Sequence, residues 1–88
     1  MSQAELKTVV DVDVIKIVVA EQIGVPVDVQ SFELDRDLYA AGLTSLATVG
    51  LMLALEDRFN VEFPESMLGR GTFRSIRSIA DALSKLVH

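Results

Sequence analysis

The stretch that decides the fold is DLYAAGLTSL, residues 37–46, which leads directly into the apolar segment 47–59. Glycine tolerates backbone angles that other residues avoid, so Gly42 predicts a turn that ends the preceding segment. Thr44 and Ser45 are both N-cap types, because a hydroxyl can accept from the free N–H groups of a first helical turn. The stretch therefore predicts a helix that begins at Thr44 or Ser45, with the Ser45 hydroxyl exposed.

The helix expected over residues 45–59 is the element that the sequence determines best. Apolar side chains form a wide band along it, and Asn60 can adopt the left-handed conformation that ends a helix. The members of this band are Leu46, Val49, Met52, Leu53, Leu55 and Phe59. Because Leu46 lies beside Ser45, we expect part of the band to stay exposed.

Two shorter helical segments are expected after residue 60. Pro64 starts a short helical turn over residues 65–69. Ser75 or Ser78 caps a last helix over residues 75–86. The side chains that this helix is expected to bury are Ile76, Ile79, Leu83 and Leu86.

Residues 5–23 fit two kinds of secondary structure. Valines alternate with acids around residues 10–15, as in a strand, and β-branched residues lower helix propensity. The length of the segment, which ends at Gly24 and Pro26, favours a helix instead. One helical stripe is available, formed by Leu6, Val10, Val14, Ile17 and Val18. The residues alone leave this choice open.

Residues 24–44 form a long connection, which needs buried anchors in order to be ordered. The candidate anchors are Val27, Val29, Phe32, Leu34, Leu38 and Tyr39. We expect Leu38 to pack beneath the helix at 45–59 and Tyr39 to make a phenolic hydrogen bond. The charged segment 35–37 is expected to be a solvated corner.

Composition excludes several functions. The 88 residues make one small domain, predicted to span 1–88, and they include no cysteine. Disulfides, a thiolate metal site and a thiol of the chain's own are therefore excluded. The only histidine is His88, at a terminus where fraying is expected. A self-contained acid–base enzyme is disfavoured, and we assign no catalytic and no metal-ligating residue.

The charge of the chain limits the kinds of partner that it is expected to bind. The net charge of −5 disfavours nucleic acid. Residues 1–65 carry −8 and residues 66–88 carry +3. An acidic body suits docking onto basic enzyme surfaces, although charge alone is better explained by solubility. No stretch approaches the roughly 20 apolar residues of a membrane span, and residues 1–7 lack the features of a signal peptide. We therefore expect a cytoplasmic protein with no membrane partner.

Residues 42–46, Gly-Leu-Thr-Ser-Leu, resemble the Gly-Leu/Ala-Asp-Ser-Leu motif of acyl and peptidyl carrier proteins. The resemblance extends to residues 20–25, 53–64 and 73–76, and it favours a helix over the ambiguous first segment. In that family a phosphopantetheinyl transferase moves 4′-phosphopantetheine from coenzyme A onto the motif serine. The resemblance thus implies that Ser45 is the attachment site.

The family also implies an all-α fold, a small four-helix bundle with three main helices, one short helix and a long loop between the first two. Its members are not enzymes. They hold an acyl or aminoacyl group as a thioester, receive it from an acyl- or amino acid-activating ligase and present it to a downstream transferase. We expect a monomer. The docking face implied is Leu43, Thr44, Leu46, Val49, Gly50 and Leu53.

Two other functions remain open from the sequence. A helical adaptor could keep this fold without being modified and bind a partner through the same face. An enzyme that uses Ser45 as a nucleophile is less favoured, because no internal histidine is present to activate it.

The chain departs from the family pattern at the start of the second helix. Thr44 replaces the usual aspartate, and Ala47 and Gly50 stand where fatty-acid carriers tend to show acids. This nearly neutral start argues against docking to ordinary fatty-acid synthase enzymes. For Gly50, close approach of a partner and crowding by a neighbouring loop are equally good explanations.

Residues 37–45 and 63–65, with Leu68 and Arg70, look closest to one subgroup of bacterial carriers. These carriers are served by ligases that resemble seryl-tRNA synthetases and activate glycine or alanine. A small hydroxyl residue at position 44 fits that subgroup. The arginines at 70, 74 and 77 could steady the prosthetic phosphate or contact a ligase, but a solvated rim explains them better.

Overall fold

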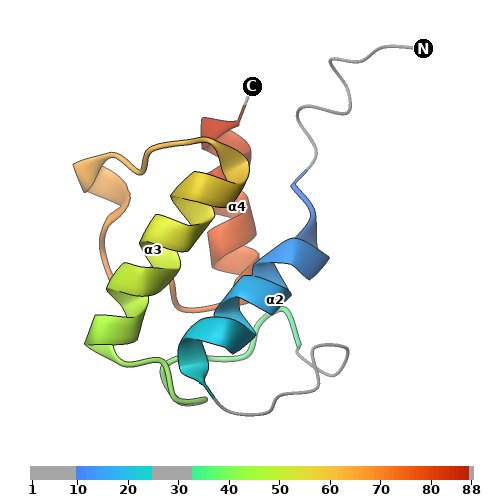
Figure 1. The fold of residues 1–88 in the computed structure, drawn as a ribbon, viewed down its shortest axis with the longest axis vertical. Coiled ribbons are helices and arrows are strands. Elements are labelled where there is room, and N and C mark those ends of the chain that lie inside the picture. Colours follow the sequence, from blue (N-terminus) through green and yellow to red (C-terminus); the bar gives the residue numbers. More distant parts are fainter. Residues whose placement is uncertain (1–9, 25–32, 88) are drawn as a thin grey trace.

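The computed structural model describes residues 10–24 and 33–87, and within these ranges the chain is helical and contains no strand. The elements are α2 (Val12–Ile23), α3 (Ser45–Phe59), the 3₁₀ helix η2 (Glu65–Met67) and α4 (Ile76–Leu86). Helix α2 packs against both α3 and α4, and the connection that carries η2 runs back along the outer side of α3 (Figure 1). The all-α prediction is confirmed, with the short fourth helix reduced to one 3₁₀ turn.

Helix α2 begins later than the sequence predicts. Asp11 has an extended backbone, and its carboxylate accepts a hydrogen bond from the Asp13 N–H at 2.9 Å, which caps the helix. A helix that runs unbroken from residue 5 is therefore wrong, and residues 5–9 lie outside the described part of the chain. The predicted end is confirmed, because Gly24 adopts the left-handed conformation at φ 77°.

The stripe that α2 buries also differs from the predicted one. The buried side chains are Ile15, Val18 and Val19, whereas Ile17 is 42% exposed and Val14 is half-buried. Apolar residues lie on nearly every side of this helix, so periodicity could not select one face. The contacts with α3 and α4 make the selection instead.

Helix α3 has the predicted bounds, and Asn60 ends it with φ 54° and ψ 50°. Its buried residues are Leu51 and Leu55. Half of the predicted apolar band faces outward: Leu46, Val49 and Leu53 are 84%, 50% and 55% exposed. The expectation that part of the band stays exposed is thus confirmed.

Residues 33–44 are held to the segment that precedes α4. The Leu38 N–H donates to the Arg74 carbonyl at 2.7 Å, and the Arg77 N–H donates to the Leu34 carbonyl at 2.9 Å. The side chain of Leu38 is fully buried, as predicted. Leu34 and Tyr39 are half-buried, and the other predicted anchors, at positions 27, 29 and 32, lie outside the described residues.

Helix α4 is capped by Ser75, and Ser78 completes a reciprocal capping box. It buries Ile76, Ile79 and Leu83 as predicted, together with Ala82, while Leu86 is half-buried. The connection before α4 joins the core through Phe63 and Phe73, whose rings meet edge-to-face at 5.4 Å. The core cluster in the described ranges is Ile15, Val18, Val19, Leu38, Leu43, Leu51, Leu55, Phe63, Phe73, Ile76, Ile79, Ala82 and Leu83.

None of the helices described in the structure is both long enough and apolar enough to cross a bilayer.

Gly50 lies against the side chain of Gln22 from α2. A Cβ atom built at this position would collide with the side-chain amide of Gln22, whose Cδ lies 3.2 Å away. Of the two explanations left open for Gly50, crowding from within the chain is present, but it comes from a helix and not from a loop. Gln22 itself is half-buried.

We predict that the effect of Gly50→Ala depends on Gln22. Alanine is favoured over glycine inside a helix by about 1 kcal/mol, but its methyl group requires the flexible Gln22 amide to move. In a Gln22→Ala background the free energy of unfolding should rise by about 1 kcal/mol, and in the wild-type background by less. Urea unfolding of the four proteins measures this. Equal gains in both backgrounds would contradict the contact.

Candidate functional site

The site is built at the loop that leads into α3. The Leu43 N–H donates to the Leu38 carbonyl at 2.9 Å, and the Ala41 N–H donates to the same carbonyl at 3.1 Å. Gly42 has φ 120°, a conformation that glycine adopts and that L side chains rarely adopt. This tight turn leads into α3, whose first residue is Ser45.

Thr44 caps α3, which resolves the choice that the sequence left open. The Ala47 N–H donates to Thr44 Oγ1 at 3.0 Å, and the Thr48 hydroxyl donates to the Thr44 carbonyl at 2.8 Å. Ser45 is exposed, and its hydroxyl makes no hydrogen bond with any residue in the described ranges. This hydroxyl is therefore accessible to another molecule.

A hollow of about 260 Å³ opens beside Ser45, between the first turns of α3 and the loop after η2. It is lined by Tyr39, Ser45, Thr48, Val49, Leu68, Gly69 and Arg70. Neither a carboxylate nor a histidine is among these residues, so none of the described residues that line the hollow can deprotonate the Ser45 hydroxyl. Within the described ranges no group of acidic, histidine or cysteine side chains could hold a metal ion.

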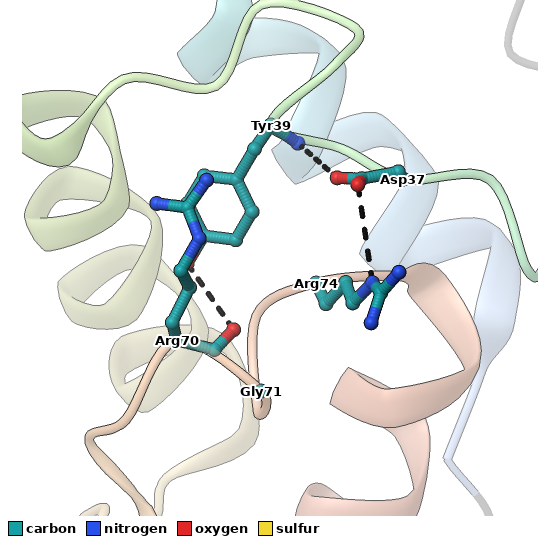
Figure 2. Close-up of a pocket in the computed structure, with 5 residues that line it drawn as sticks. All are labelled: Asp37, Tyr39, Arg70, Gly71 and Arg74. Carbon is teal, nitrogen blue, oxygen red and sulfur yellow. Dashed lines mark hydrogen bonds and ion pairs between the residues drawn. The ribbon is translucent and has the colours of Figure 1, made fainter.

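A second hollow, of about 350 Å³, adjoins the first and shares Tyr39 and Arg70 with it. Its other lining residues are Asp37, Gly71 and Arg74 (Figure 2). The Arg70 guanidinium lies 3.7 Å from the centre of the Tyr39 ring, and the phenolic hydroxyl donates to the Arg70 carbonyl at 3.3 Å. The predicted hydrogen bond of Tyr39 is confirmed. The stacking of Arg70 on Tyr39 could not be predicted from the sequence.

The charged segment 35–37 is more than a solvated corner. Asp35 accepts from the Arg77 Nε at 2.6 Å, and Asp37 lies 3.9 Å from the Arg74 Nε. The hydrogen bond from Arg77 lowers the pKa of Asp35 below its ordinary value. Although both pairs are exposed, they link the loop to the start of α4 in the same place as the backbone hydrogen bonds.

The six residues predicted to form a docking face separate into two groups. Thr44, Leu46, Val49 and Leu53 are exposed along one side of α3. Leu43 is 3% exposed, so its assignment to an accessible face is wrong, because the turn points its side chain into the core. Gly50 lies under Gln22 and faces α2. Leu68, 45% exposed beside the hollow, was not expected there.

Comparison with known proteins identifies the family of this chain. A family model described as the phosphopantetheine attachment site matches residues 13–83. The chain therefore belongs to the family of phosphopantetheine-binding carrier proteins. It is a carrier protein and not an enzyme, and 4′-phosphopantetheine is its prosthetic group.

The chain is similar to carrier proteins that are named for amino acids. It is 46% identical over 66 residues to the aminoacyl carrier protein of Agrobacterium fabrum, covering 75% of this chain and 77% of that one. It is 39% identical over 56 residues to the D-alanyl carrier protein of Streptococcus pyogenes serotype M1, covering 62% of this chain and 71% of the relative.

Solved structures agree in fold. One is an Agrobacterium tumefaciens carrier protein bound to an engineered Bradyrhizobium japonicum glycine:carrier protein ligase and AMP. That comparison has a TM-score of 0.76 and 40% identity, covering 83% of this chain and 97% of that chain. A solution structure of an Agrobacterium tumefaciens protein matches with a TM-score of 0.65 and 39% identity, covering 85% of this chain and 90% of that chain.

We predict that Thr44, and not Ser45, stabilises α3. Thr44→Ala removes the acceptor for the Ala47 N–H and should lower the free energy of unfolding by about 1 kcal/mol. Thr44→Asp should retain the cap and gain a favourable interaction with the helix dipole. The matched control, Ser45→Ala, should change stability by less than about 0.5 kcal/mol. Urea unfolding of the unmodified proteins measures all three, and a larger loss in Ser45→Ala would reverse the assignment.

Proposed function

We propose that Ser45 carries the phosphopantetheine group through a phosphodiester bond to its hydroxyl oxygen. The observation that supports this most directly is the exposed hydroxyl at the start of α3, free of hydrogen bonds within the described residues because Thr44 provides the cap. The position also matches the serine of the family motif. The adjoining hollow leaves room for a group attached there.

The prosthetic group supplies the chemistry that this chain lacks. The sequence contains no cysteine, so the thiol that holds an acyl or aminoacyl group as a thioester comes with the group. The residues beside Ser45 include no base. Deprotonation of the hydroxyl during attachment therefore falls to the phosphopantetheinyl transferase, and this chain contributes an accessible and correctly placed oxygen.

We further propose that the cargo is a small amino acid and that an amino acid:carrier protein ligase loads it. Support comes from the aminoacyl and D-alanyl carriers among the relatives, and from the solved complex of a related carrier with a glycine:carrier protein ligase. A downstream transferase would accept the cargo. The monomeric state and the cytoplasmic location stay predictions.

The docking face proposed for these enzymes lies on the outer side of α3. Its members are Thr44, Leu46, Val49 and Leu53, and no charged residue occurs between positions 45 and 55. Apolar contacts would therefore dominate over ion pairs in this docking. An unmodified adaptor could use the same surface, but the relatives do not favour that alternative.

We predict that Ser45→Ala abolishes modification. Each protein is incubated with coenzyme A and a broad-specificity phosphopantetheinyl transferase, and the intact mass is measured. The wild type should gain the mass of one phosphopantetheine group, and Ser45→Ala should gain none. Thr48→Val, which removes the neighbouring hydroxyl of the hollow, should still be modified. Mass added to Ser45→Ala would place the attachment site elsewhere.

We predict that an acidic substitution on the outer side of α3 weakens ligase binding. Leu46→Asp replaces the most exposed large apolar side chain with a charge, and its Kd for a glycine:carrier protein ligase should rise about tenfold or more. Ile17→Asp, at an exposed apolar position on α2, is the control and should leave the Kd unchanged. Titration calorimetry measures both, and equal losses in the two variants would exclude this docking face.

A further inference from the structure

Arg70 differs in one respect from the two arginines that follow it. Arg74 and Arg77 each pair with an aspartate of the 33–44 loop. Arg70 has no carboxylate partner in the described part of the chain, and its guanidinium lies over the Tyr39 ring. Its charge is therefore not neutralised by a neighbouring acid.

The charge that lines the hollow beside Ser45 is positive. Among the described residues, Arg70 is the only charged one that lines it, and the other lining residues supply hydroxyl, glycine, aromatic and aliphatic groups. Asp37, which would oppose an anion, lines the second hollow and not the first. The first hollow thus combines one cation with apolar walls at Val49 and Leu68.

We propose that Arg70 binds the phosphodiester of the prosthetic group, an inference that rests on the proposed attachment at Ser45. The phosphodiester is the anion joined directly to the Ser45 hydroxyl oxygen, whereas an amino acid held as a thioester carries an ammonium group. A guanidinium presents a planar fork of donors that matches phosphate oxygens. Arg70 is therefore a residue that positions the phosphopantetheine group, called the arm below.

Tethering makes this contact favourable. Because the phosphodiester is covalently fixed at one wall of the hollow, its effective concentration at Arg70 on another wall is high. Charge-assisted hydrogen bonds to phosphate are stronger than contact with an exposed aromatic ring. Modification should thus draw the guanidinium toward Ser45 and set the arm against Val49 and Leu68.

The test is nuclear magnetic resonance of the apo and holo proteins, each checked by intact mass. In the wild type, the Nε–Hε cross-peak of Arg70 should move on modification, and those of Arg74 and Arg77 should not. The ³¹P resonance of the holo protein should differ from its position in urea-unfolded holo protein. In Arg70→Gln it should move toward the unfolded position. Arg70→Gln keeps the backbone carbonyl that accepts from Tyr39.

Arg58→Gln is the matched control. Arg58 is an exposed arginine thirteen residues further along α3, about 20 Å from Ser45 at about 1.5 Å per residue. Its removal should leave the ³¹P position unchanged. An Arg70 cross-peak that does not move, or equal ³¹P shifts in both variants, overturns the inference while the carrier function stands. If no arm mass is added to the wild type, the proposed attachment and this inference fail together.

Discussion

The position of the exposed Ser45 hydroxyl depends on how Leu38 is buried. Its side chain has no exposed surface, its N–H donates to Arg74, and its carbonyl accepts from Ala41 and Leu43. Burying a leucine contributes about 1.5–3 kcal/mol, which is a large share of the stability of a small domain. Leu38 thereby fixes the loop against the segment before α4. The turn over residues 38–43 starts from this fixed point, so it also determines where α3 begins at Ser45.

Local signals were sufficient for the helices whose ends carry capping chemistry. The bounds of α3, its left-handed end at Asn60 and the cap of α4 at Ser75 follow from residue types within a few positions. The start of α2 did not, because the carboxylate of Asp11 competes with an apolar pattern that continues before it. The buried face of α2 could not be predicted from local signals either. Valine and isoleucine occur on several faces of this helix, and packing against the other helices determines which face is buried.

The candidate site shows the same division. The motif around Ser45 and the outward-facing leucines of α3 could be predicted from adjacent residues. The burial of Leu43 could not, because it depends on a turn held by Leu38. The stacking of Arg70 on Tyr39 joins residues 31 positions apart, and the Asp35–Arg77 pair joins residues 42 apart, so no sequence spacing reveals either.

The division of labour between Thr44 and Ser45 has a consequence for how such a carrier is used. Since Thr44 Oγ1 accepts from the Ala47 N–H, the proposed attachment at the Ser45 hydroxyl would remove no hydrogen bond from the helix. The unmodified and modified forms would then have the same cap at the start of α3, so formation of this helix does not require the prosthetic group.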